Sequence, residues 1–92
     1  MKHNVYFEGK VQSLTVETEN GSATVGVITP GRYTFSTSTE ERMVVTSGAL
    51  MVKQPDEKEW RSVKAGQEFT VNRNTSFDVE VTADASYICY YK

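Results

Sequence analysis

The segment Gly31-Arg32-Tyr33-Thr34-Phe35-Ser36-Thr37, which is followed by Glu41 and then Gly48, decides the fold of this chain. Its aromatic residues at 33 and 35 alternate with hydroxyl residues at 34 and 36, and a period of two is typical of a half-buried β-strand. Thr, Tyr and Phe also favour extended backbone. The pattern therefore predicts a strand here, with Tyr33, Phe35 and Thr37 on one face.

The rest of the 92-residue chain repeats this pattern. Short alternating runs are separated by turn signals such as Glu19-Asn20-Gly21-Ser22 and Asn72-Arg73-Asn74. Strands of about five residues at such spacing indicate an all-β sandwich or barrel. The only helical candidate is a single turn at Thr39–Arg42. No linker or repeat interrupts the chain, so residues 1–92 are expected to form a single domain.

The spacing in the opening segment resembles the first sequence motif of the cupins. That motif has a His-x-His pair, then a Glu, then a Gly; here Phe35 and Thr37 stand at the histidine positions, while Glu41 and Gly48 match. A second stretch, from Gly66 through Asn72 and Asn74 to Phe77, resembles the second motif with its final His replaced. A phenyl ring has no lone pair for a metal. We therefore expect a cupin-type jelly-roll barrel or sandwich with little or no helix and no metal site.

Charge and cysteine content narrow the classes of partner. The net charge is only −2, and the 10 basic residues form no stripe, which argues against nucleic acid or an anionic membrane as ligand. No apolar run approaches the roughly 20 residues of a membrane span. The first residues run straight into a strand pattern, so no signal peptide is expected. The single cysteine, Cys89, favours a reducing cytoplasm.

Several segments of the chain match one family: Tyr6-Phe7-x-Gly9-Lys10-Val11, Val25-Gly26-Val27, Tyr33-Thr34-Phe35-Ser36-Thr37, Ser47-Gly48-Ala49-Leu50 and Tyr87-x-Cys89-x-Tyr91. Through them the chain resembles, over its whole length, the small cupin-like pyrimidine/purine nucleoside phosphorylases. The resemblance implies phosphate-dependent cleavage of many purine and pyrimidine nucleosides into a free base and a (deoxy)ribose 1-phosphate. It also implies a homodimer of jelly-roll subunits, no cofactor beyond inorganic phosphate as co-substrate, and no metal.

In the geometry that the cupin resemblance implies, five side chains should point into the barrel mouth: Tyr33, Phe35, Thr37, Glu41 and Phe77. Glu41 is the only carboxyl among them, and we expect it to contact the ribose or the cationic transition state. Tyr33 and Thr37 are expected to hydrogen-bond the ligand, and Phe35 and Phe77 to pack against base or sugar. The alternative for Glu41 is an ion pair with a barrel-lining Arg or Lys that only ties strands together.

Phosphate could be held by one of four cations, namely Lys10, Arg32, Arg42 and Arg73, of which Lys10 and Arg73 are favoured by their positions in the motifs. Ser36, Thr37 and Ser47 could add uncharged donors. For each cation, a solvated surface charge is the simpler explanation. Cys89 is expected to be a small core residue. The last strand has bulky groups on both faces, which favours a dimer interface there.

Two other interpretations stay open at this stage. The chain could be a non-catalytic cupin module that binds a small metabolite, or it could act as a structural dimer. A metal-dependent cupin enzyme is disfavoured because three of the four usual ligand positions lack histidine or carboxylate.

Overall fold

The computed structural model describes residues 1–92, and strands account for nearly all of the regular structure. One short 3₁₀ turn, η1 (Phe7–Gly9), follows the first strand. The strands are β1 (His3–Tyr6), β2 (Val11–Thr18), β3 (Gly21–Ile28), β4 (Gly31–Ser36), β5 (Glu41–Ser47), β6 (Ala49–Lys53), β7 (Arg61–Lys64), β8 (Glu68–Val71), β9 (Ser76–Val81) and β10 (Ala85–Tyr91). The all-β class predicted from the alternation is confirmed.

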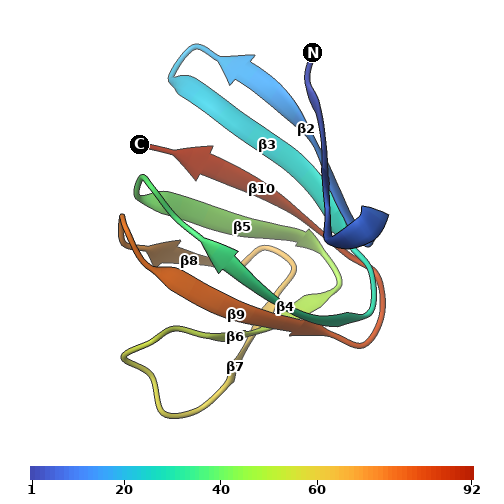
Figure 1. Cartoon of the computed structure of the whole chain (residues 1–92), viewed down its shortest axis with the longest axis vertical. Helices are drawn as coiled ribbons and strands as arrows, with labels where there is room; N and C mark the ends of the chain where they lie inside the picture. The colour runs from blue at the N-terminus through green and yellow to red at the C-terminus, as the bar shows by residue number, and fades with distance from the viewer.

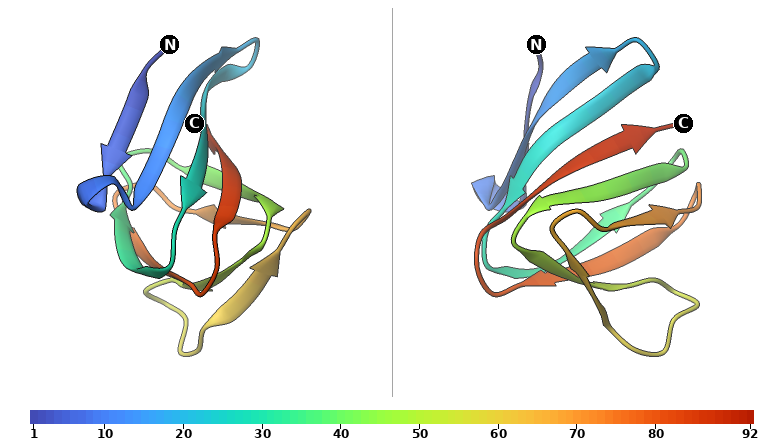
Figure 2. Two further views of the ribbon diagram at one scale, coloured as in Figure 1. Left: turned by 90° about the vertical axis from the view of Figure 1, so that its right-hand side faces the viewer. Right: turned by 180° about the vertical axis from the view of Figure 1, so that it is seen from behind.

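The strands form two antiparallel sheets that face each other (Figures 1 and 2). The larger has the order β1-β2-β3-β10-β5-β8 and the smaller the order β4-β9-β6-β7. From β3 to β10 the chain passes to the opposite sheet at every connection except the one between β6 and β7. This arrangement is the predicted sandwich, and its interior lies between the sheets.

The core is built from the alternate residues that face this interior. Val45 and Ile28 from the larger sheet and Leu50, Val52 and Val79 from the smaller one are fully buried. Strand β9 shows the pattern most simply, because its buried and half-buried residues alternate along all six positions. The side-chain period of a strand thus places every second residue against the opposite sheet.

The expected helical turn at Thr39–Arg42 is absent. Glu41 instead begins β5, where it lies between Tyr91 of β10 and Val71 of β8. The two neighbouring strands supply ladder partners for its backbone, and this pairing outweighs the weak local preference for a turn. The only helical segment lies elsewhere, at Phe7–Gly9, and no helix has the length and apolar character needed to cross a membrane.

Two motif positions are explained by backbone geometry. Gly48 has a φ of +74°, and a Cβ atom there would lie 2.9 Å from the carbonyl oxygen of Asp84. Asn74 stands where the second motif usually has glycine, and its φ is +55°. Asparagine tolerates this left-handed region better than most residues. The turns of both motifs are therefore retained although the histidines are replaced.

Candidate active site

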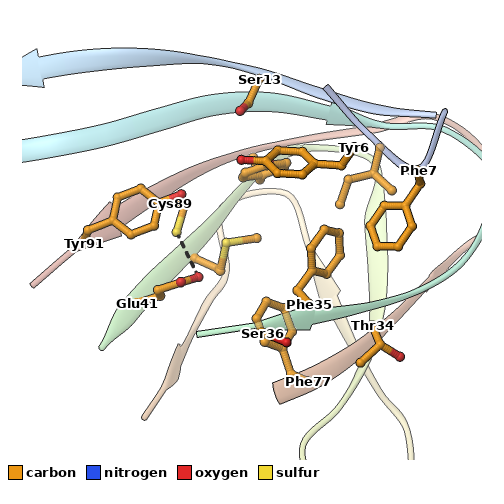
Figure 3. Close-up of a pocket in the computed structure, with 13 residues that line it drawn as sticks. Tyr6, Phe7, Ser13, Thr34, Phe35, Ser36, Glu41, Phe77, Cys89 and Tyr91 are labelled. Atoms are coloured by element: carbon orange, nitrogen blue, oxygen red, sulfur yellow. Dashed lines mark hydrogen bonds between the residues drawn. The ribbon is translucent and has the colours of Figure 1, made fainter. Parts of the chain in front are cut away.

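A cavity of about 210 Å³ opens between the two sheets (Figure 3). Its walls come from both layers and from the turn η1, and most of its lining is apolar or aromatic. The lining residues are Tyr6, Phe7, Ser13, Ile28, Thr34, Phe35, Ser36, Glu41, Met43, Phe77, Tyr87, Cys89 and Tyr91. A small, largely apolar cavity with a few polar groups is the usual form of a small-molecule site.

One end of the cavity is aromatic. Phe35 and Phe77 are directly opposite each other on β4 and β9, and their rings stack with centroids 5.5 Å apart and planes inclined by 28°. Phe7 meets Phe35 edge-on at 5.4 Å. The structure therefore brings the two predicted phenylalanines together at the cavity wall and adds a third ring from the N-terminal turn (Figure 3).

The other end of the cavity is polar and is formed by Glu41, Cys89 and Tyr91 (Figure 3). The Cys89 thiol donates to Glu41 Oε1 across 3.5 Å. The Tyr91 hydroxyl is hydrogen-bonded to Thr24 Oγ1 at 3.0 Å. None of the four ion pairs of the chain includes Glu41, and no Lys or Arg lines the cavity. The alternative interpretation of Glu41 as half of a structural ion pair is thus wrong.

Burial raises the pKa values of four side chains that line the cavity. Desolvation raises the pKa of Glu41, and the hydrogen bond from Cys89 opposes part of that rise. Burial, followed by the nearby Glu41 charge, raises the pKa of the Cys89 thiol well above its ordinary value. Burial also raises the pKa of Tyr87 to about 12 and that of Tyr91 above its usual range. At neutral pH the Cys89 thiol and the Tyr87 and Tyr91 phenols are therefore protonated, and Glu41 has the only carboxyl group in the lining.

Tyr33 and Thr37 do not line the cavity, contrary to the expected orientation. The Tyr33 hydroxyl donates to the carbonyl oxygen of Thr29 at 2.8 Å. The Thr37 hydroxyl donates to the Asn72 carbonyl at 2.7 Å and accepts from the Thr75 amide at 3.0 Å. Both hydroxyls therefore secure connecting segments, and their contact with a ligand stays a prediction.

The predicted phosphate-binding cations also lie outside the lining. Lys10 and Arg73 are exposed. Arg32 pairs with Glu80 at 3.4 Å, and Arg42 pairs with Glu68 at 3.3 Å. Among the predicted neutral donors, only Ser36 faces the cavity.

Seven polar or aromatic lining residues were not among the predicted site residues: Tyr6, Phe7, Ser13, Thr34, Tyr87, Cys89 and Tyr91. For Tyr87 a sequence signal exists, namely a glycine within a strand pattern. Gly26 is the direct partner of Tyr87 on β3, and a Cβ atom there would lie 2.5 Å from the tyrosine ring. Phe7 carried no such signal, because its φ of +52° and its place over the cavity depend on how β1 and β2 pair.

Comparison with known proteins shows which family the chain resembles. A family profile described as pyrimidine/purine nucleoside phosphorylase matches residues 1–91. A Pseudoalteromonas atlantica protein with that name is 47% identical over 88 residues, which cover 96% of this chain and 95% of the relative. A crystal structure of a Vibrio parahaemolyticus protein of unknown function superposes with a TM-score of 0.96 at 42% identity, covering 99% of this chain and 97% of that one.

A more distant structure identifies the fold class. An RmlC-like cupin from Shewanella frigidimarina superposes with a TM-score of 0.72 at 12% identity, covering 96% of this chain and 79% of that one. This likeness confirms the cupin-like architecture alone. Because the family profile spans nearly the whole chain and the relative shares almost half of its residues, the chain belongs to the pyrimidine/purine nucleoside phosphorylase family.

Proposed function

We propose that this protein cleaves the N-glycosidic bond of purine and pyrimidine nucleosides with inorganic phosphate, releasing a free base and a (deoxy)ribose 1-phosphate without a metal. Membership of the phosphorylase family supports the reaction. The observation that carries it is the single carboxyl group of Glu41, which faces an otherwise aromatic and hydroxyl-lined cavity without an ion-pair partner. A carboxylate in this position can stabilise a reaction centre that becomes positively charged.

Glu41 is assigned to the sugar. As the bond to the base breaks, the anomeric carbon acquires oxocarbenium character, and a carboxylate close by stabilises that charge in a cavity of low polarity. An arginine or lysine partner would neutralise the carboxylate and weaken this effect. The lack of such a partner therefore suits the proposed role.

Phe35 and Phe77 are assigned to the base. Their stacked rings line the end of the cavity remote from Glu41 (Figure 3). Aromatic faces bind any heterocycle, because every nucleobase has a flat π surface. No Asn, Gln, Arg or Lys lines the cavity to read the edge of a particular base. An aromatic wall of this kind supports the proposal that the protein accepts both purine and pyrimidine bases.

Phosphate is assigned to hydroxyl donors and to a cation at the mouth. Ser13, Ser36 and Tyr87 supply hydroxyls within the lining. Arg73 lies in the β8–β9 connection, which shares an end of the molecule with the β4–β5 connection and the C-terminus (Figure 1). Arg73 and Lys10 are the cations proposed to attract the anion, and Thr37 and Tyr33 keep their proposed contacts only if a ligand rearranges the hydrogen bonds described above.

The test is release of base from uridine, inosine and adenosine, with and without phosphate and with EDTA. We expect release that requires phosphate and ignores the chelator. Glu41→Gln should lower kcat/KM by about 100-fold, the loss typical when one stabilising group is removed from a transition state. Glu40→Gln is the matched control, because Glu40 is the adjacent residue but pairs with Lys92 outside the cavity. It should retain activity.

Each contrary result has its own meaning. No release from any nucleoside would leave the non-catalytic binding module as the better interpretation. Release abolished by EDTA would restore the metal-dependent one, and full activity of Glu41→Gln would remove Glu41 from the mechanism.

The outer face of the larger sheet is proposed as the interface of a homodimer. Leu14, Val25, Ile88 and Val44 are direct cross-strand neighbours on β2, β3, β10 and β5. Leu14 and Val25 are 42% and 44% exposed, and the other two are half-buried. This uncharged row runs across four strands, and a two-fold interface requires such a self-complementary surface. A second copy of this chain would cover it.

Sedimentation velocity tests the dimer. The wild-type protein should sediment as twice the 10.3 kDa chain, and Val25→Lys should dissociate it by placing a charge in the row. Ser62→Lys, on an exposed position of β7 in the other sheet, is the matched control and should remain dimeric. A monomeric wild type would contradict the proposal. Location in the cytoplasm is likewise proposed, on the support of the one free, buried cysteine.

A further inference from the structure

Glu41 has one side-chain hydrogen bond, and it comes from Cys89 (Figure 3). The two residues lie on the adjacent strands β5 and β10. Tyr91 is the direct partner of Glu41, and Met43 is the direct partner of Cys89, so Cys89 and Glu41 are diagonal neighbours on the inner face of the sheet. The contact is fixed by strand register and does not depend on a mobile loop.

We propose that Cys89 is a positioning residue for Glu41, whose Oε1 it holds through the S–H donor so that the second carboxylate oxygen faces the ligand. This inference rests on the proposed function, because it assigns a role to a neighbour of the carboxyl that the reaction needs. Cys89 touches no reacting atom in this scheme. Its effect is transmitted through the orientation and the ionisation of Glu41.

No other side chain hydrogen-bonds to Glu41. Tyr91, from the same strand as Cys89, is bonded to Thr24. On β8 the partner of Glu41 is Val71, which has no polar side chain. The adjacent charge on Glu40 is paired with Lys92 at 3.4 Å.

Of the remaining titratable groups in the cavity, Tyr6 comes from β1 and Tyr87 from β10, and neither hydrogen-bonds to Glu41. The pKa of the thiol is raised by burial, so Cys89 remains a donor at neutral pH.

A thiol suits this position for a physical reason. An S–H group is a weak donor, and it orients a carboxylate without neutralising it. A guanidinium or ammonium group would form a strong ion pair and reduce the negative potential at the sugar.

The test follows the acid limb of the pH profile, which is the pH range in which kcat/KM falls as Glu41 becomes protonated. A hydrogen bond to the charged form favours ionisation, so its loss in Cys89→Ala raises the pKa of Glu41. Activity requires the carboxylate, and it should therefore fall at a higher pH in this variant, by roughly half a pH unit for a weak hydrogen bond. Cys89→Ser keeps a donor, so its acid limb should stay in place or move to lower pH.

The experiment measures kcat/KM for phosphorolysis of uridine against pH in the wild type and both variants. Val79→Ala is the control: Val79 is buried in the smaller sheet and does not line the cavity. Its packing loss should leave the acid limb unchanged. A second readout needs no turnover. Titration of ¹³C-labelled glutamate by NMR, with the Glu41 signal assigned by its loss in Glu41→Gln, should show the same order of shifts.

An acid limb and a carboxyl titration that coincide in Cys89→Ala and the wild type would overturn the inference. So would equal shifts in Cys89→Ala and Val79→Ala, because these would reflect general loosening of the core. Failure of the proposed function is distinguishable, since it would appear as no phosphate-dependent release by the wild type. The NMR titration would then still decide whether Cys89 controls Glu41.

Discussion

Gly26 is the position where one added carbon should disturb the cavity most directly. It is the direct cross-strand partner of Tyr87, and a Cβ atom there would lie 2.5 Å from the Cζ and Oη atoms of that ring. Ordinary contacts begin near 3.4 Å, so Gly26→Ala must displace Tyr87 by about one ångström. Tyr87 is only 6% exposed and lines the cavity, so the ring can move only into the cavity or against packed neighbours.

The cost follows from overpacking. Inserting a methyl group into a packed site costs about 1–3 kcal/mol, and the lower chain entropy of alanine offsets about 0.5–1 kcal/mol of it. A net loss of about 1–2 kcal/mol should lower Tm by about 5–15 °C in a domain of this size. Displacement of a cavity wall by an ångström should also reduce kcat/KM by about tenfold to 100-fold.

A double-mutant cycle isolates the clash. Urea unfolding of Gly26→Ala, Tyr87→Leu and the double variant gives the coupling between the two positions. Since leucine lacks the ring, Gly26→Ala should cost little in that background, and the coupling should reach about 1 kcal/mol or more. Additive free energies of unfolding would refute the reasoning, because they would mean that Tyr87 is not what the new methyl group meets.

Two further predictions concern Glu41 and Thr37. Burial raises the pKa of Glu41, so the folded state loses stability as pH rises through that pKa. Glu41→Gln should therefore raise Tm by a few degrees at pH 8. At about pH 4, below the ordinary glutamate pKa of 4.5, thermal scans should show no change in Tm. A difference that persists at low pH would point to packing instead. Thr37→Val should destabilise the fold by about 1–3 kcal/mol, because the Thr75 amide and Asn72 carbonyl lose their partner, while kcat/KM per folded molecule stays within about twofold. A large loss of turnover would instead support the predicted contact of Thr37 with the ligand.

The sequence by itself determined the class of fold and part of the cavity. Alternation with a period of two assigns each residue to a face of its strand, and this local rule was enough to predict an all-β sandwich or barrel. The cavity positions of Phe35, Phe77 and Glu41 followed from the geometry that the cupin resemblance implies, and all three residues do line the cavity. The replaced histidine positions were identified from the spacing of the two cupin-like motifs.

Only the tertiary structure decided which inward groups are free to meet a ligand. Tyr33 lies on the same face of β4 as Phe35, yet its hydroxyl donates to a backbone carbonyl of the preceding connection. Phe7 reaches the cavity because β1 pairs with β2 and the chain then turns through a left-handed conformation. The contact of Cys89 with Glu41 depends on the register of β5 and β10. Strand periodicity is a local property, whereas hydrogen-bond partners and neighbours across a cavity come from residues distant in sequence, so no local pattern can specify them.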